Sequence, residues 1–156
     1  MAQGLGAGDS MIGSAYNNPA ICASSILSVL SHSKELSIAK AILVMPLVMH
    51  DSTVRYLGRS NVAFREVSGL VAVRPDLFAN FNERFFSSLV TSVNAIQWLV
   101  ATGYVEFDGG VKLVSPLKIG MEFGDRAVRI AKASGHISNL LSSSAEELYL
   151  NFRVKL

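Results

Sequence analysis

The residues best suited to hydrolytic or metal chemistry are three histidines and their polar neighbours. His50, Asp51 and Ser52 are consecutive, whereas a hydrolase needs a nucleophile, a base and an orienting acid whose side chains converge. Adjacent side chains point in different directions, so this triplet is better suited to capping a helix. His32, His50 and His136 are far apart in the sequence and lack the paired spacing of a zinc site. We therefore predict no catalytic residues and no metal.

The cysteine and the glycine-rich start of the chain also suggest no reactive site. Cys22 is the single cysteine and follows an apolar helix start, which is typical of a buried, unreactive thiol in a reducing cytoplasm. Gly4, Gly6 and Gly8 lack the preceding strand and following helix that make a phosphate-binding loop. We expect no cofactor, and a flexible N-terminal tail over residues 1–14.

Two groups of cationic side chains are suited to binding anions. Arg126, Arg129 and Lys132 recur every three residues, and we expect them along one side of a helix. A second basic rim consists of Arg55, Arg59 and Arg65. Each group is interpreted as a solvated surface, or as a contact with an acidic protein surface or a DNA backbone. The net charge of +2 gives no global field that would drive avid binding to nucleic acid.

The composition favours a subunit of a larger assembly. Half of the 156 residues are apolar and 17% are charged, which leaves few charges to cover the surface and suggests apolar area reserved for partners. The most hydrophobic run, residues 41–49, is far shorter than the roughly 20 residues that cross a bilayer. We expect a cytoplasmic protein with no membrane span and a single domain over residues 15–156.

The first half of the chain is predicted to be helical. Asn18 is suited to cap a helix that opens at Pro19 and runs to about Ser33. Further helices are expected over about residues 37–45, where Pro46 disturbs the pattern, and over residues 61–73, with a helix cap at residues 50–53 between them.

A fourth helix is predicted to open at Pro75 and to carry an aromatic stripe for core packing. The stripe consists of Leu77, Phe78, Phe81, Phe85 and Leu89. Thr91 or Ser92 is expected to cap a fifth helix that ends at Gly103. The buried face of this fifth helix is predicted to contain Val93, Ile96, Leu99 and Val100.

Beyond Gly103 the hydrophobic pattern alternates, which predicts a β-hairpin with its turn at residues 108–110. The expected cross-strand pairs are Phe107 with Val111, Glu106 with Lys112, and Val105 with Leu113. A helix over about residues 125–141 and a short one opened by the capping box at residues 144–147 follow, and residues 152–156 are expected to be extended. The predicted fold is mainly α with one β-hairpin, an α+β, winged-helix-like bundle whose winged-helix-like segment spans about residues 61–115.

The charges near the hairpin oppose reading of a DNA groove. Groove contacts need Arg or Lys, but residues 85–111 contain neither, and Glu106 and Asp108 lie on the predicted wing. The wing is therefore interpreted as a packing element or a protein-docking element. The candidate protein-docking surface consists of Ser92, Asn94, Gln97, Thr102 and Tyr104.

Two short motifs resemble those of a known family. Residues 16–20 (Tyr-Asn-Asn-Pro-Ala) before a helix, and residues 45–50 (Met-Pro-Leu-Val-Met-His) followed by Thr53-Val54-Arg55, are similar to the middle components of three-component ABC systems. The hairpin and C-terminal helices fall in the same order, so the resemblance spans about residues 16–156.

This resemblance implies a non-catalytic adaptor. Its partners would be an SMC-like ABC ATPase, related to ATPases of chromosome maintenance and double-strand-break repair, and an effector that is often nuclease-like. Such systems, including Lamassu-like ones, are associated with bacterial defence against phage or plasmids, and the subunit would meet DNA only through the complex. The alternative function is that of a winged-helix DNA-binding transcriptional regulator.

Overall fold

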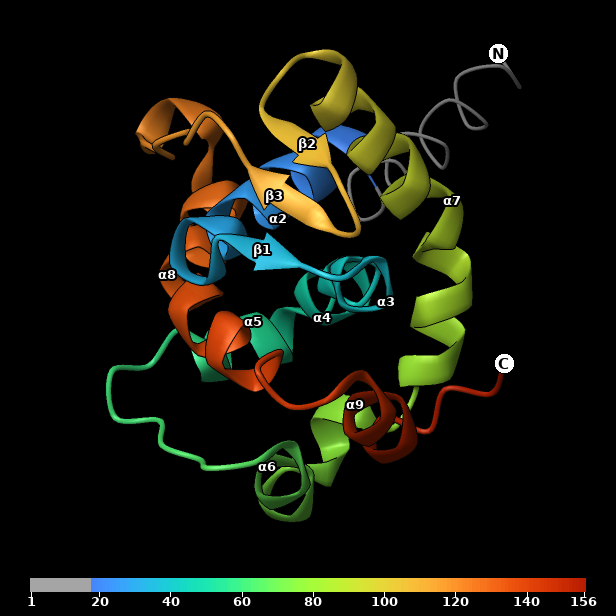
Figure 1. Ribbon diagram of the computed structural model, residues 1–156. Coiled ribbons are helices and arrows are strands. Elements are labelled where there is room, and N and C mark those ends of the chain that lie inside the picture. Colours follow the sequence, from blue (N-terminus) through green and yellow to red (C-terminus); the bar gives the residue numbers. More distant parts are fainter. Residues whose placement is uncertain (1–17) are drawn as a thin grey trace, which may run out of the picture.

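The computed structural model describes residues 18–156 and shows a bundle of helices with a small sheet on one side (Figure 1). The tail expected over residues 1–14 lies outside the described residues. Helices dominate, and the sheet has three antiparallel strands. The predicted class, mainly α within α+β, is therefore confirmed.

Helix α2 (Pro19–Ser33) is the central element of the bundle. The Asn18 side chain accepts a hydrogen bond from the backbone N–H of Ala20 at 2.7 Å, and Pro19 takes the first helical position, as predicted. The helix contains no Asp, Glu, Lys or Arg, so it can be buried without leaving a charge unpaired. It packs against both α7 (Phe81–Ala101) and α8 (Asp125–Leu140).

The prediction of a single helix over about residues 37–45 is wrong, because the helix breaks at residues 42–43 and Pro46 lies inside a second helix. The segment contains α3 (Ile38–Ala41) and a separate α4 (Val44–Val48). A continuous helix would have brought the Pro46 ring against the carbonyl of Ile42. The chain turns before Pro46 instead, so the proline lies in the first turn of α4, where its missing N–H is tolerated.

The third predicted helix starts six residues later than expected. After α5 (Asp51–Leu57), residues 61–66 are not helical, and α6 spans Val67–Val73. In this loop the half-buried Val62 and Phe64 alternate with exposed residues. That two-residue period is typical of extended backbone.

The fourth and fifth predicted helices are one helix. A short 3₁₀ helix, η1 (Pro75–Phe78), precedes the 21-residue α7, which runs through the predicted cap at Thr91 and Ser92. Both side chains are buried, and Ser92 contacts Cys22 of α2 at 4.0 Å between Oγ and Sγ. A small side chain at this site allows the two helices to approach closely, so Ser92 supports packing and does not cap a helix.

The β-hairpin has the predicted register. Strands β2 (Val105–Phe107) and β3 (Val111–Leu113) pair Glu106 with Lys112, with the two apolar pairs on either side. A third strand, β1 (Glu35–Leu36), pairs with β3 and gives the sheet order β1-β3-β2. Its two residues are too few to show a periodic pattern. The sheet therefore includes a strand, β1, that lies before the predicted winged-helix-like segment of residues 61–115.

Helix α9 (Ala145–Asn151) closes the bundle at the end opposite the sheet, and α8 leads to it from the sheet end (Figure 1). A 3₁₀ helix, η2 (Met121–Phe123), precedes α8, and α9 is capped by Ser144, which accepts from the Glu147 N–H as the capping box predicted. Phe152 is buried against the rings of Phe78 and Phe81. The expected extended segment therefore starts only after a turn at Phe152 and Arg153.

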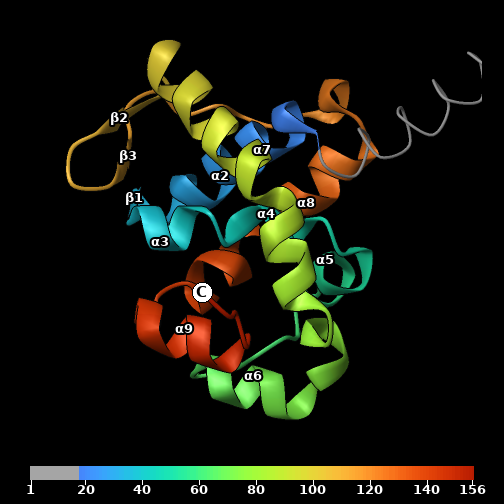
Figure 2. The same ribbon diagram turned by 90° about the vertical axis from the view of Figure 1, so that its right-hand side faces the viewer.

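Helix α7 runs along the whole bundle, from η1 and α6 at one end to the hairpin at the other (Figures 1 and 2). One side of α7 packs on α2 and α4, and in Figure 2 no other described element crosses in front of its outer side. No described helix has the length and apolar character needed to cross a membrane.

The end of α7 gives a test of the backbone geometry. Gly103 has φ +81°, its N–H bonds the carbonyl of Val100, and the N–H of Tyr104 bonds the carbonyl of Leu99, which is the Schellman pattern that favours glycine. We predict that Gly103→Ala lowers the free energy of unfolding by about 1 kcal/mol, although a Cβ there would meet no atom within 4 Å.

Gly69→Ala is the matched control for Gly103→Ala. Gly69 lies within α6, and a Cβ there would also meet nothing within 4 Å, but its backbone is helical. Alanine is favoured over glycine in a helix, so this variant is expected to gain about 0.5 kcal/mol. Urea unfolding of both variants measures the two changes, and effects of the same sign would contradict the assignment of the cap.

Candidate interaction surfaces

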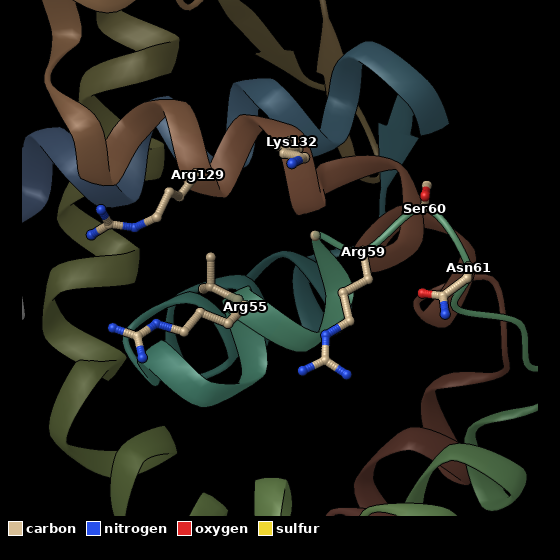
Figure 3. Close-up of a pocket in the computed structure, with 8 residues that line it drawn as sticks. Arg55, Arg59, Ser60, Asn61, Arg129 and Lys132 are labelled. Atoms are coloured by element: carbon tan, nitrogen blue, oxygen red, sulfur yellow. The ribbon is translucent and has the colours of Figure 1, made fainter.

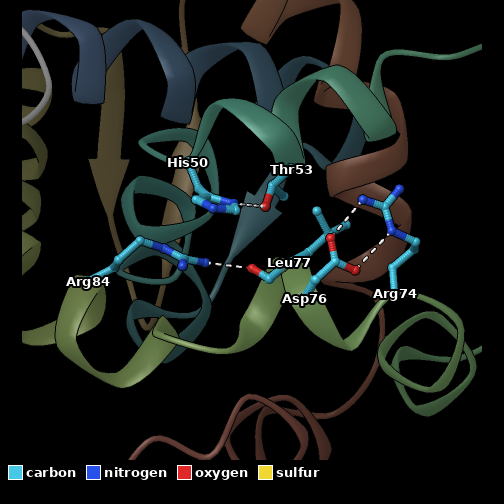
Figure 4. A network of polar contacts seen from close by, with 6 residues as sticks. All are labelled: His50, Thr53, Arg74, Asp76, Leu77 and Arg84. Carbon is cyan, nitrogen blue, oxygen red and sulfur yellow. Dashed lines mark hydrogen bonds and ion pairs between the residues drawn. The ribbon is translucent and has the colours of Figure 1, made fainter.

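The histidine considered for catalysis belongs to a structural network (Figure 4). His50 occupies the N-cap position of α5, and its Nδ1 lies 2.8 Å from Oγ1 of Thr53, a residue that is fully buried. Burial lowers the pKa of His50, and the nearby Arg84 lowers it further, while Asp51 and Asp76 act in the opposite direction. The side chain therefore favours its neutral form and fixes the start of α5.

Arg84 joins three elements at the same place. Its Nε donates to the carbonyl of Pro46 at 3.0 Å and its Nη2 donates to the carbonyl of Leu77 at 2.8 Å (Figure 4), while the guanidinium lies 5.3 Å from the centre of the Phe81 ring. Burial lowers the pKa of Arg84 to about 10, so the side chain stays charged at neutral pH. Arg84 therefore holds α4 and η1 against α7, and its guanidinium is engaged within the fold.

The other groups considered for chemistry are also engaged in the fold. His32 Nε2 lies 3.2 Å from Ser134 Oγ, and His136 donates from Nδ1 to the carbonyl of Leu57 at 2.7 Å. Burial raises the pKa of the Cys22 thiol to about 12, which leaves almost no thiolate at neutral pH. Among residues 18–156, no three His, Cys, Asp or Glu side chains are placed to hold a metal ion.

The two predicted groups of cations meet in one place. We name this place the cationic hollow, a cavity of about 480 Å³ between α8 and the end of α5. Figure 3 shows Arg129 and Lys132 leaving α8 on one side and Arg55 and Arg59 leaving α5 and its following loop on the other. The lining consists of these four side chains with Val54, Gly58, Ser60 and Asn61. Within the described part of the chain the hollow therefore has four cations and no carboxylate in its lining.

The third cation of each predicted group lies elsewhere. Arg126 and Arg65 do not line the cationic hollow. Three residues turn a helix by about 300°, so side chains spaced by three drift around it by about 60° each step. Arg126 is half-buried, whereas Arg129 and Lys132 are exposed, and the structure does not bring Arg126 into the cationic hollow with them.

The hydrogen bond between α8 and α5 fixes the width of the cationic hollow. His136 lies on α8 one turn beyond Lys132 and bonds the last residue of α5, which holds the two sides of the cationic hollow together. In Figure 3 the Arg59 side chain points away from α8, and its guanidinium lies 5.6 Å from the centre of the Tyr56 ring. Four like charges held together repel one another and raise the local potential. An anionic group placed between them would relieve that repulsion, and Ser60 and Asn61 would add neutral hydrogen-bonding groups.

The predicted docking residues of α7 face different directions. Ser92 is buried against α2 and cannot contact a partner, so its assignment to the docking surface is wrong. Asn94 lines an apolar groove of about 720 Å³ between α2, α7 and α8, and Gln97 lines a separate apolar hollow beside the hairpin. Tyr104 is half-buried and stacks on Trp98 with ring centres 6.0 Å apart.

Sequence reasoning missed that α7 has two apolar stripes. Val93 and Val100, predicted to be buried, are 43% and 41% exposed, and Phe86 and Val90 on the same side are 46% and 72% exposed. The spacing of these residues is regular only when residues 81–101 are taken as one helix. The predicted end of one helix and start of another at Thr91 and Ser92 divided this pattern, so the exposed apolar stripe was not predicted.

A model of a protein family matches almost the whole chain. The family is described as ABC-three component (ABC-3C) system Middle Component 3, and the match covers residues 10–156. The searches of curated proteins and of solved structures found no match.

The neutral state of His50 gives a pH dependence. In the unfolded chain the imidazole takes up a proton near its ordinary pKa of 6.5, whereas in the folded protein its pKa is lower. The unfolded state therefore binds more protons between these two values, and the stability supplied by neutral His50 is present above pH 6.5 and is lost as the pH falls below it.

We predict that His50→Gln flattens this part of the pH dependence. Urea unfolding between about pH 7.5 and about pH 5 should show a smaller loss of stability on acidification for His50→Gln than for the wild type. Ser52→Ala, at a neighbouring exposed position without a titrating group, should follow the wild type. An equally steep loss in His50→Gln would show that another group is responsible.

Proposed function

The chain belongs to the ABC-three component system Middle Component 3 family, and from this premise we propose that it is a non-catalytic adaptor in a bacterial defence complex. Its partners in this proposal are an SMC-like ABC ATPase and an effector subunit, which carry out the chemistry against phage or plasmid DNA. The complex would act in the cytoplasm. The family itself identifies a middle component of a multi-component system, and such a component implies partner subunits.

The observation that carries the proposal is the cationic hollow, which is a rigid charged surface without a reactive group. Arg129 and Lys132 come from α8, Arg55 comes from α5 and Arg59 from the loop after it, and a hydrogen bond joins the two helices. Arginine recognises carboxylates in a bidentate manner, and charge complementarity between proteins speeds their encounter and selects the partner. We infer that the hollow, through Arg55, Arg59, Arg129 and Lys132, binds an acidic surface of the ATPase.

The engagement of the candidate catalytic groups supports a non-catalytic role. His32, His50 and His136 each contact a protein group from another turn or element, and the Cys22 thiol is buried with a raised pKa. An enzyme needs a nucleophile, base or acid that faces its substrate. These four side chains are engaged by protein groups of the described fold, and the Cys22 thiol is fully buried.

The alternative function, a winged-helix DNA-binding regulator, is supported by the order of the elements. A helix, a strand that pairs with β3, further helices and a hairpin follow one another along the chain. Against it, α7 has no Lys or Arg beyond residue 84, and the exposed Glu106 and Asp108 give the hairpin negative charge. A DNA groove would repel that surface. The adaptor function is therefore the one that the charges favour.

The adaptor function predicts a salt-dependent contact through the cationic hollow. The chain is co-expressed with the proteins encoded by its flanking genes, and the purified pair is measured by biolayer interferometry at rising salt after nuclease treatment. We expect the double variant Arg55→Glu/Arg129→Glu to bind the ATPase at least about tenfold more weakly, with a smaller effect of salt.

Arg65→Glu is the matched control for the double variant. It reverses an exposed arginine outside the cationic hollow and should bind like the wild type. Wild-type affinity of the double variant would remove the hollow from the contact. A contact that disappears with nuclease treatment would instead assign the hollow to a DNA backbone.

A mobility-shift assay separates the two functions. If the chain is an adaptor, the purified subunit alone should not retard a duplex of about 30 base pairs even at about 50 mM salt, where phosphate contacts are strongest. Retardation of a defined duplex by the isolated chain, with loss of binding on substitution of α7 residues, would favour the regulator instead.

A further inference from the structure

A groove in the bundle begins at the first residues that the structure describes. It has a volume of about 720 Å³ and lies where α2, α7, η2 and α8 meet. Its lining includes Asn18, Pro19, Leu27, Asn94, Trp98 and Phe123. None of the described residues in its lining is charged. We name this cavity the N-terminal groove.

Small side chains leave the N-terminal groove open. Four of its lining residues are alanines, which come from α2, α7 and α8. Large apolar side chains stand beside them, and Trp98 is 53% exposed although it also stacks on the Tyr104 ring, while Phe123 is 40% exposed. Exposed apolar surface that gathers in one place marks a site of contact. The groove therefore has room for large side chains and favours an uncharged, largely apolar occupant.

The residues that precede the N-terminal groove in the chain have the matching composition. Residues 10–17 (Ser-Met-Ile-Gly-Ser-Ala-Tyr-Asn) contain no Asp, Glu, Lys or Arg and include the large side chains of Met11, Ile12 and Tyr16. A charged side chain is costly to move from water into an apolar cavity unless it is paired. This segment can enter the groove without placing a charge there.

The covalent connection at Asn18 favours this segment over a separate molecule. Asn18 itself lines the groove, and Tyr16 is two residues earlier in the chain. An extended chain spans about 3.3–3.6 Å per residue, so the backbone of Tyr16 can lie no more than about 7 Å from that of Asn18. A segment tethered so closely has an effective concentration of about a millimolar. A separate molecule of similar affinity would have to exceed that concentration to replace it.

The polar groups in the lining are suited to a tyrosine. A buried tyrosine needs a hydrogen-bond partner for its hydroxyl, while its ring packs on apolar groups. Ser24 lines the groove and donates from Oγ to the carbonyl of Ile21 at 3.0 Å, so its oxygen can still accept a hydrogen bond. The exposed Asn94 on α7 adds an amide to the lining. Tyr16 could therefore place its ring against Trp98 and bond its hydroxyl to either group.

We propose that residues 10–17 bind in the N-terminal groove of their own chain, with Ile12 and Tyr16 covering Trp98. The match to the family begins at residue 10, so the proposed occupant and the groove belong to the same matched region. The contact shields apolar surface from association with other chains. It goes beyond the adaptor function and does not depend on it, because it involves neither the cationic hollow nor a partner subunit.

The single tryptophan of the chain makes the proposal measurable. Trp98 is that tryptophan and lines the groove, so its fluorescence in the full chain reports on the groove alone. Tyr16→Glu and Ile12→Glu each add a charge that an apolar cavity excludes. In each variant we expect the rate constant for quenching by acrylamide to rise about twofold, with a shift of the emission to the red.

Leu5→Glu is the matched control for these two variants. It makes the same kind of change in the N-terminal region but outside the proposed occupant, and its quenching should equal that of the wild type. Circular dichroism establishes that each variant is folded. An equal rise in all three variants would show a general effect of added charge and would overturn the proposal.

Nuclear Overhauser contacts in the wild-type chain give a second measurement that needs no variant. We expect contacts between the ring protons of Tyr16 and the indole of Trp98. Their absence, or quenching that neither Tyr16→Glu nor Ile12→Glu changes, would overturn the proposal. Contacts that arise only between differently labelled copies would assign the groove to the segment of a second chain and would overturn it as well.

Discussion

The burial of an uncharged helix is the constraint on which the structure depends. Helix α2 contains no Asp, Glu, Lys or Arg and packs against α7, α8 and α4. Small side chains at the contacts, among them Ser88 and Ser92 on α7 and Ala133 and Ser134 on α8, are buried and allow the helices to approach closely. Close packing of this kind supplies most of the dispersion and hydrophobic stabilisation of a core. The burial of α2 therefore determines where α7 and α8 lie.

The same constraint decides which surfaces remain for partners. Because α7 meets α2 along one side, its opposite side carries an apolar stripe that the described part of the chain leaves exposed. Because α8 meets α2 and α5, cations from α8 and from α5 with its following loop line one cavity, the cationic hollow. The protein thus presents one apolar and one charged surface on rigid helices. Two different surfaces support the proposed adaptor function, which needs contacts with two partners.

Local signals in the sequence predicted those parts of the fold that local chemistry determines. The cap at Asn18, the glycine end at Gly103 and the register of the hairpin depend on a few adjacent residues, and all three are present. The sequence could not show that Ser92 packs on Cys22, because this contact joins residues 70 positions apart. The cations were identified as candidates, but their meeting in one hollow depends on the distant bond from His136 to Leu57.

We propose that the protein works through its contact surfaces and not through a reaction of its own. Hydroxyl-radical footprinting of the chain, alone and assembled with the partner subunits of the proposed complex, measures the exposure of each side chain directly. We predict that Phe86 and Phe107 lose reactivity on assembly, while the exposed Met121 and Leu150 on other elements keep theirs. Unchanged reactivity of both phenylalanines in a stable complex would contradict it.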